Sequence, residues 1–177
     1  MANIIAIAGK DGVGKSTLAG SLAHRMGDTA LIAFATSLRQ MCVDYAILTY
    51  DEAWSKPTPP EVRKILREYS LSFKSYLGDT IFAFNTLKTI SRCLNAGIYT
   101  VIIHDMRFAV ELKALREEFS HSSDRLYVIY VGSDELSQSE AEMPSFADLP
   151  QISQEADIRL PQYPSFSHVE YLVQELI

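Results

Sequence analysis

The sequence predicts an α/β fold with a central parallel sheet flanked by helices. Three runs carry this prediction: residues 4–8, 99–104 and 126–131 are apolar, rich in β-branched side chains and without polar alternation. Such runs are typical of strands buried on both faces of a parallel sheet. Helical segments separate them, and this alternation indicates a doubly wound sheet whose ligands gather at the carboxyl ends of the strands.

The remaining elements follow from local signals. Ser37 offers a helix N-cap, Pro60 suits the first turn of a helix, and Asp79 and Gly97 bracket another helix as cap and stop. The prolines of segment 49–60 exclude a helix there. In chain order we expect strand 4–8, helix 16–26, strand 30–34, helix 37–47, helix 61–69, helix 80–95, strand 99–104, helix 110–119, strand 126–131 and helix 165–177.

Composition limits the classes of partner. A chain of 177 residues suggests one domain that is large enough to bury a hydrophobic core without disulfides or a structural metal. Its net charge of -6 argues against a nucleic-acid polymer as partner, because such proteins usually present a basic face. Cys42 and Cys93 lack metal-ligand spacing and are expected to be reduced thiols. No apolar run approaches membrane-spanning length, so we expect a cytoplasmic protein with no membrane partner.

The segment between the first strand and the first helix fits G-x-x-x-x-G-K-[ST], the phosphate-binding loop. Its glycines let backbone N–H groups point at phosphate oxygens, while Lys15 reaches the β- and γ-phosphates and Ser16 binds Mg²⁺. A glycine turn without nucleotide is the alternative, and the flanking strand and helix argue against it. We assign nucleotide binding to Gly9, Lys10, Asp11, Gly12, Val13, Gly14, Lys15, Ser16 and Thr17.

Charged residues also follow two other strands. Asp105 comes directly after a buried strand and is expected to hold Mg²⁺ or its water beside Ser16, the alternative being a turn or helix-capping aspartate. The Arg107 guanidinium can fork onto phosphate oxygens, although an ion pair with Glu111 would also satisfy it. Arg39 follows the second strand and is expected at the same sheet edge unless it is a solvated surface residue.

Three blocks of sequence extend these motifs. Gly9-Lys10-x-Gly12-x-Gly14-Lys15 is the first, segment 34–39 (F-A-T-S-L-R) the second, and segment 104–111 (H-D-M-R-F-A-V-E) the third. Together they resemble the phage-type deoxynucleoside monophosphate kinases, a branch of the P-loop nucleotide kinases with F-A-x-P-L-K and D-x-R-F-x-x-E elements. Weaker likenesses at 61–82 and 155–158 extend the resemblance over nearly the whole chain.

The resemblance implies the three-layer fold of that branch and ATP-dependent, Mg²⁺-assisted phosphorylation of a deoxynucleoside 5′-monophosphate. It implies a single domain with a helical acceptor-binding insertion at about 49–97 and a lid at about 132–150. It also favours a homodimer, and the host cytoplasm if the chain is phage-encoded. The implied catalytic residues are Lys15, Asp105 and Arg107, and the implied acceptor-binding residues are Arg39, Arg63, Lys74 and Arg107. Phe73, Tyr76 and Phe82 are candidates for stacking a base, core packing being the alternative.

The expected lid departs from the family in its charge. Segment 132–150 has no Lys or Arg, and its acidic residues are Asp134, Glu135, Glu140, Glu142 and Asp148. An acidic lid repels a triphosphate unless cations such as Arg125 or Arg159 turn inward. The sequence therefore leaves two alternatives to the leading hypothesis. One is a nucleotide-binding sensor with little turnover, and the other is a different small-molecule kinase, such as one acting on phosphomevalonate or dephospho-coenzyme A.

Overall fold

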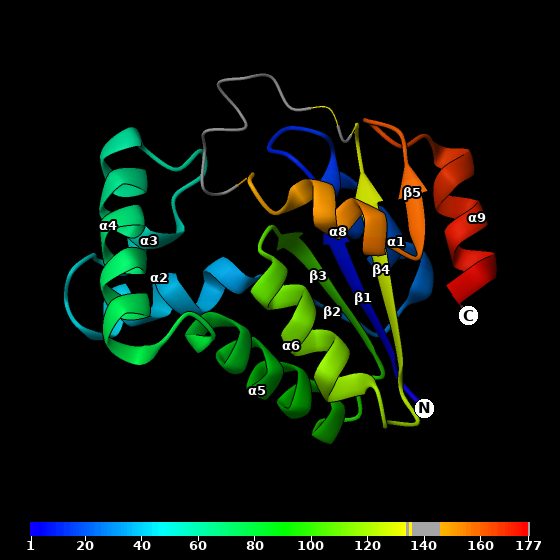
Figure 1. Cartoon of the computed structure of the whole chain (residues 1–177), viewed down its shortest axis with the longest axis horizontal. Helices are drawn as coiled ribbons and strands as arrows, with labels where there is room; N and C mark the ends of the chain where they lie inside the picture. The colour runs from blue at the N-terminus through cyan, green and yellow to red at the C-terminus, as the bar shows by residue number, and fades with distance from the viewer. Residues whose placement is uncertain (134, 136–145, 177) are drawn as a thin grey trace.

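The computed structural model describes residues 1–133, 135 and 146–176 and contains a parallel sheet that confirms the predicted fold class. The strand order is β2-β3-β1-β4-β5, and every neighbouring pair is parallel. All strands therefore end at one edge (Figure 1). The strands are β1 (Asn3–Ala8), β2 (Thr29–Ile32), β3 (Thr100–Met106), β4 (Arg125–Val131) and β5 (Ile158–Leu160).

Helices cover both faces of the sheet and bury alternate strand residues. On one face, α1 and α9 pack over side chains such as Ile5 and Ile102, and on the other, α5, α6 and α8 pack over side chains such as Ile4 and Ile103. These strand residues are fully buried, as the apolar runs predict. The helices are α1 (Lys15–Met26), α2 (Phe34–Asp44), α3 (Tyr50–Trp54), α4 (Pro60–Leu77), α5 (Ile81–Asn95), α6 (Ala109–Phe119), α8 (Leu149–Glu155) and α9 (Phe166–Leu176).

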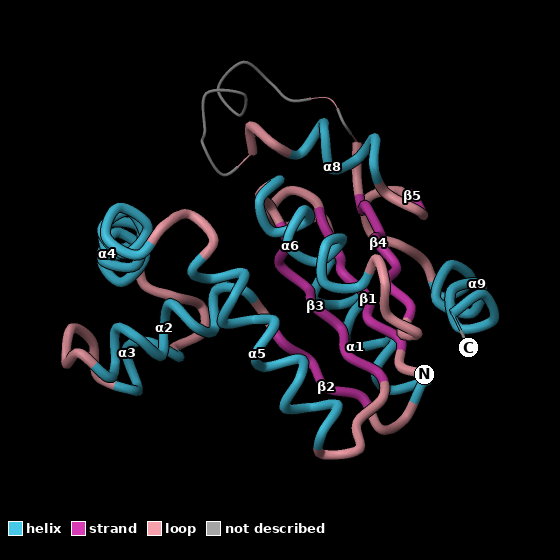
Figure 2. Tube along the Cα trace, turned by 60° about the horizontal axis from the view of Figure 1, so that its bottom comes forward, coloured by secondary structure: helices cyan, strands magenta, loops and turns pink. Residues whose placement is uncertain are grey.

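Three helices form a separate layer beside the sheet. Both views place α2, α3 and α4 to one side of the strands (Figures 1 and 2). They share a small core of their own, which is built around Cys42, Ala53 and Leu66. Because α2 also contacts α5 and β3, this layer is held beside the sheet.

Two predictions about helices are wrong: where one begins, and whether segment 49–60 contains one. The helix expected from Ser37 begins at Phe34, because the carboxylate of Asp105 accepts hydrogen bonds from the N–H groups of Phe34 and Ala35. The segment expected to lack a helix contains α3, whose first turn is held by a capping box between Thr49 and Glu52. The first error arises from a contact with a residue that is distant in the sequence. The second could have been avoided, because the capping box is present in the sequence T-Y-D-E at residues 49–52.

Other boundaries differ only in length. Helix α4 runs to Leu77 rather than ending near residue 69, and β3 continues through Asp105 to Met106. Helix α5 begins at Ile81 without a side-chain cap from Asp79, whereas Gly97 adopts a positive φ of 84° at its end, as expected of a stop. Within the part of the chain that the structure describes, no helix is long and apolar enough to cross a membrane.

Candidate active site

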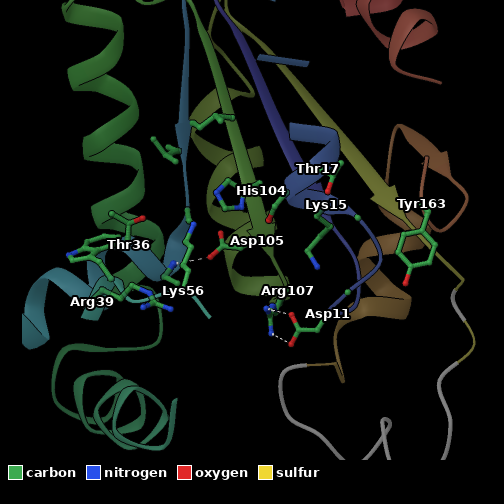
Figure 3. Close-up of a pocket in the computed structure, with 18 residues that line it drawn as sticks. Asp11, Lys15, Thr17, Thr36, Arg39, Lys56, His104, Asp105, Arg107 and Tyr163 are labelled. Carbon is green, nitrogen blue, oxygen red and sulfur yellow. Dashed lines mark hydrogen bonds and ion pairs between the residues drawn. The ribbon is translucent and has the colours of Figure 1, made fainter. Parts of the chain in front are cut away.

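A cavity of about 670 Å³ lies where the strands end. Its walls come from the loop after β1, the start of α1, the end of β3, and helices α2 and α3 (Figure 3). β1 and β3 are neighbours in the sheet. The helix that follows β1, α1, covers one face of the sheet, whereas the helix that follows β3, α6, covers the other face. The cavity therefore occupies the point where the chain changes sides, which is the usual ligand position in open α/β sheets.

The loop after β1 has the backbone conformation that its glycines allow. Gly9 has a φ of 140°, and a Cβ added there would collide with the carbonyl oxygen of Val131. Gly14 has a φ of 100° and forms the N-cap of α1, so the helix begins with Lys15, and its N-terminus, where unpaired N–H groups are available to an anion, borders the cavity. The conformation fits a phosphate cradle, while Val13 is buried beneath the loop.

Lys15 is buried at the base of this cradle, with only 7% of its surface exposed. Its ammonium donates hydrogen bonds to the carbonyl oxygens of Gly9, at 2.7 Å, and of Lys10. Burial lowers its pKa to about 8, with a further contribution from the nearby Arg107 guanidinium, although Asp11 and Asp105 act in the opposite direction. The structure thus keeps the Lys15 ammonium in the cradle, although burial there removes water from the charge and so disfavours the charged form.

Asp105 lies within β3 and borders the cavity. One carboxylate oxygen accepts the N–H of Phe34 at 2.7 Å, and the other accepts the N–H of Ala35 at 3.0 Å. Asp105 therefore caps α2 from a different element, which was the alternative role that the sequence left open. A carboxylate can accept about four hydrogen bonds or metal contacts, so this cap leaves it able to bind a cation as well.

Arg107 also borders the cavity, and its partner is Asp11 of the phosphate-binding loop rather than Glu111. The two guanidinium nitrogens lie 2.5 and 3.1 Å from the two Asp11 carboxylate oxygens. Glu111 instead accepts the backbone N–H of Arg107. The Asp11 carboxylate thus occupies the fork of the arginine that we expect to bind phosphate (Figure 3).

The cations expected to bind the acceptor do not all gather at this cavity. Arg39 borders it, donates hydrogen bonds to Ala53 and Thr58, and lies over the ring of Trp54. Burial lowers the pKa of Arg39. Lys74 lines an adjoining second cavity. Arg63 is exposed, borders neither cavity and donates to the Thr58 carbonyl.

The three aromatic candidates for base stacking lie in different surroundings. Phe73 packs against the rings of Tyr45 and Tyr69, and Tyr76 is 88% exposed. Phe82 is buried and lines the second cavity. Of the three, Phe82 alone borders either of these two cavities.

The expected acidic lid falls largely outside the described residues, since residues 134 and 136–145 are among those not described. Asp148 accepts the N–H of Ala109 and so caps α6. Arg125 pairs in register with Asn3 at the amino end of the sheet, so the expectation that it turns toward the phosphates is wrong. Arg159 pairs with Tyr130 near the carboxyl end and remains a candidate.

The cavity contains residues that the sequence did not single out. Lys56, His104 and Tyr163 line it. Tyr163 has a positive φ of 53°, unusual for a side chain of its size, and its N–H donates to the carbonyl oxygen of Val13 at 3.0 Å. His104 directly precedes Asp105 on β3 and could have been predicted from that position, whereas no local signal marked Lys56 or Tyr163.

Comparison with known proteins places the fold. No protein-family model matches the sequence, and no curated protein matches it. Dephospho-CoA kinase from Campylobacter jejuni matches in structure with a TM-score of 0.54 at 14% identity, over 98% of this chain and 94% of that chain. The chain therefore shares the fold of that kinase. The predicted three-layer arrangement around a parallel sheet is therefore confirmed.

Two shikimate kinases match with lower scores. The enzyme from Aquifex aeolicus has a TM-score of 0.47 at 17% identity, over 97% of this chain and 92% of that chain. The enzyme from Acinetobacter baumannii, in complex with shikimate, has a TM-score of 0.47 at 14% identity, over 99% of this chain and 90% of that chain.

Proposed function

We propose that this chain is a kinase that transfers the γ-phosphoryl group of ATP to a deoxynucleoside 5′-monophosphate. The observation that carries the proposal is the convergence of Lys15, Asp105 and Arg107 on one cavity beside a glycine cradle. These residues come from the blocks that resemble the phage-type kinases. The P-loop kinase fold supports the same reaction class.

In the proposed reaction, an oxygen of the acceptor phosphate attacks the γ-phosphorus of ATP. A new P–O bond forms while the bond between the γ-phosphorus and the β,γ-bridging oxygen breaks, and its electron pair leaves with ADP. Any proton on the acceptor phosphate passes to solvent. Lys15 and the loop N–H groups bind the β- and γ-phosphates, and Arg107 stabilises charge on the oxygens of the transferred group.

The residues present fit a Mg²⁺ ion. Ser16 is exposed and borders the cavity, and Asp105 keeps accepting capacity beyond its two hydrogen bonds. Among the described residues no group of three or more His, Cys, Asp or Glu side chains could hold a metal, so these two residues would bind the ion together with phosphate oxygens and water. When bound, Mg²⁺ neutralises charge on the phosphate oxygens.

A nucleotide-binding sensor with little turnover is the second candidate. The Asp11–Arg107 ion pair favours it, because it neutralises a cation that phosphoryl transfer requires. A third candidate, a kinase for another small molecule, draws support from the structural likeness to a dephospho-CoA kinase.

One experiment separates these candidates. The protein is incubated with Mg-ATP and each common nucleoside and deoxynucleoside monophosphate, dephospho-CoA and phosphomevalonate, and ADP and phosphorylated product are measured. We expect a deoxynucleoside diphosphate from at least one acceptor, and no turnover by Lys15→Ala. Tight ATP binding without product from any acceptor would favour the sensor and contradict our proposal.

A further inference from the structure

A second cavity, of about 220 Å³, adjoins the first. Ala35, Asp105 and Arg107 border both cavities, so a ligand whose phosphate contacts Arg107 can extend from one into the other. The second cavity is smaller than the roughly 300 to 1,000 Å³ that encloses a whole drug-sized ligand. Its size therefore suits one part of a substrate, such as a single ring system.

The walls of the second cavity suit a flat, largely apolar group. Phe34, Phe82 and Phe108 contribute aromatic rings, and Leu38 adds an aliphatic side chain. Phe34 and Phe82 are held in the core with 4% and 7% of their surfaces exposed. Rings that are fixed in this way offer a rigid apolar surface to a ligand.

The lining also contains polar and charged side chains, namely Ser70, Lys74, Asp105, Arg107 and Glu111, and of these Glu111 is the buried one. Glu111 is only 6% exposed, and its Oε2 accepts the N–H of Arg107 at 2.9 Å and of Phe108 at 3.1 Å. Among the described residues nothing donates to or accepts from its Oε1, although the side chain lines the cavity. Because the side chain borders the cavity, a ligand there that forms a hydrogen bond with Oε1 gains affinity and selectivity.

The protonation of Glu111 indicates which kind of ligand atom it meets. Burial raises its pKa to about 8, and Asp105 adds to the increase, while the N–H groups of Arg107 and Phe108 and the Lys74 ammonium oppose it. At neutral pH the side chain is therefore a carboxylic acid. Because Oε2 accepts two N–H groups, the proton belongs on Oε1, which then acts as a donor.

We propose that the second cavity binds the base of the acceptor nucleotide and that Glu111 selects this base by donating a hydrogen bond from Oε1 to a ring carbonyl or ring nitrogen. The inference rests on the proposed function, since it takes the acceptor to be a nucleoside monophosphate bound at Arg107. It adds a specificity-determining residue and a substrate feature that this residue recognises.

Binding without ATP tests the cavity. Calorimetry compares each deoxynucleoside monophosphate with deoxyribose 5-phosphate, which lacks the base. We expect at least one nucleotide to bind about ten-fold or more tightly than the sugar phosphate, as for bases on aromatic side chains. Ser70→Leu fills the second cavity from α4 and should remove this advantage, whereas Ser72→Leu, on the exposed side of the same helix, should keep it.

Two substitutions test the Glu111 donor. Glu111→Gln keeps an oxygen for the two N–H groups and an amide donor for the ligand, so nucleotide affinity should stay within about three-fold of the parent. Glu111→Met lacks both and should lose about ten-fold in nucleotide affinity. Affinity for deoxyribose 5-phosphate is the control, because general damage at Arg107 would weaken that ligand equally.

Each outcome decides the inference. Equal losses in Glu111→Gln and Glu111→Met would overturn the donor role. Equal affinity for sugar phosphate and nucleotides in the parent, or binding of neither, would overturn the base site, even if the kinase assay succeeds. Base-dependent binding that Ser70→Leu removes, without phosphoryl transfer to any acceptor, would support the site and overturn the proposed kinase.

Discussion

At the scale of single residues, Lys15 combines a buried position with a pKa lowered to about 8. Bound phosphates would favour its charged form and raise that pKa again, so ATP binding above pH 8 should take up a proton. We expect ATP affinity to fall by up to about ten-fold per pH unit above pH 8. Calorimetry in buffers of different ionisation enthalpy measures the uptake, and Lys15→Ala should bind ATP weakly without this pH dependence.

Arg107 and Asp11 allow a second prediction at this scale. Asp11 is 66% exposed and Arg107 28%, so water screens their ion pair, which is worth about 0.5 to 1 kcal/mol. Asp11→Asn should therefore lower the acceptor KM about two- to five-fold by releasing the guanidinium. Kinetics at saturating ATP measure the change. If Asp11→Asn gives the same gain in an Arg107→Ala background, the pair is not the cause.

At the scale of secondary-structure elements, Asp105 connects β3 to the start of α2. Asp105→Asn turns one of the two accepting oxygens into a donor, so we expect a loss of about 1 kcal/mol in the free energy of unfolding, as for a lost helix cap. Urea denaturation measures the loss.

Asp148→Asn is the matched control for this prediction, because Asp148 caps α6 and lines neither cavity. It should cost similar stability without changing the Mg²⁺ concentration that turnover requires. Asp105→Asn should raise that concentration. Superimposable Mg²⁺ titrations for parent and Asp105→Asn would leave Asp105 with a structural role alone.

Helix α2 shows how much of the structure could be predicted from the sequence at this scale. Motif and strand patterns predict the cradle at Gly9 to Ser16 and the sheet edge at Asp105, because both depend on neighbours in sequence. The start of α2 at Phe34 depends on a carboxylate 71 residues away, so no local signal could predict it. The partner of Arg107 is likewise distant, since Asp11 lies 96 residues earlier. The position of Arg125 was predictable, because a residue that opens a parallel strand lies away from the ligand edge.

At the scale of the whole molecule, Glu111 links stability to pH. Its pKa is raised from 4.5 to about 8, so between these values the folded chain keeps a proton that the unfolded chain has lost. The stability associated with the neutral acid is present at low pH and declines as pH rises toward 8, by at most about 1.4 kcal/mol per pH unit.

Glu111→Gln should remove this contribution, because an amide does not titrate. We expect the difference in unfolding free energy between Glu111→Gln and the parent to increase from pH 5 to pH 8 and then level off. Urea denaturation across this range measures it. A constant difference would show that Glu111 is ionised in the folded protein.

The position of Tyr163 has a consequence for the order in which the molecule is made. The phosphate-binding loop is complete by Thr17, but the segment packed against it, with the Tyr163 N–H on the Val13 carbonyl and Pro164 beside Gly14, is synthesised nearly 150 residues later. A growing chain therefore carries this loop without that support until residue 163 has been made. Nucleotide should stabilise only chains that contain this segment. Purified chains ending at residue 160 should gain no protease resistance from ATP, whereas those extending through α9 should.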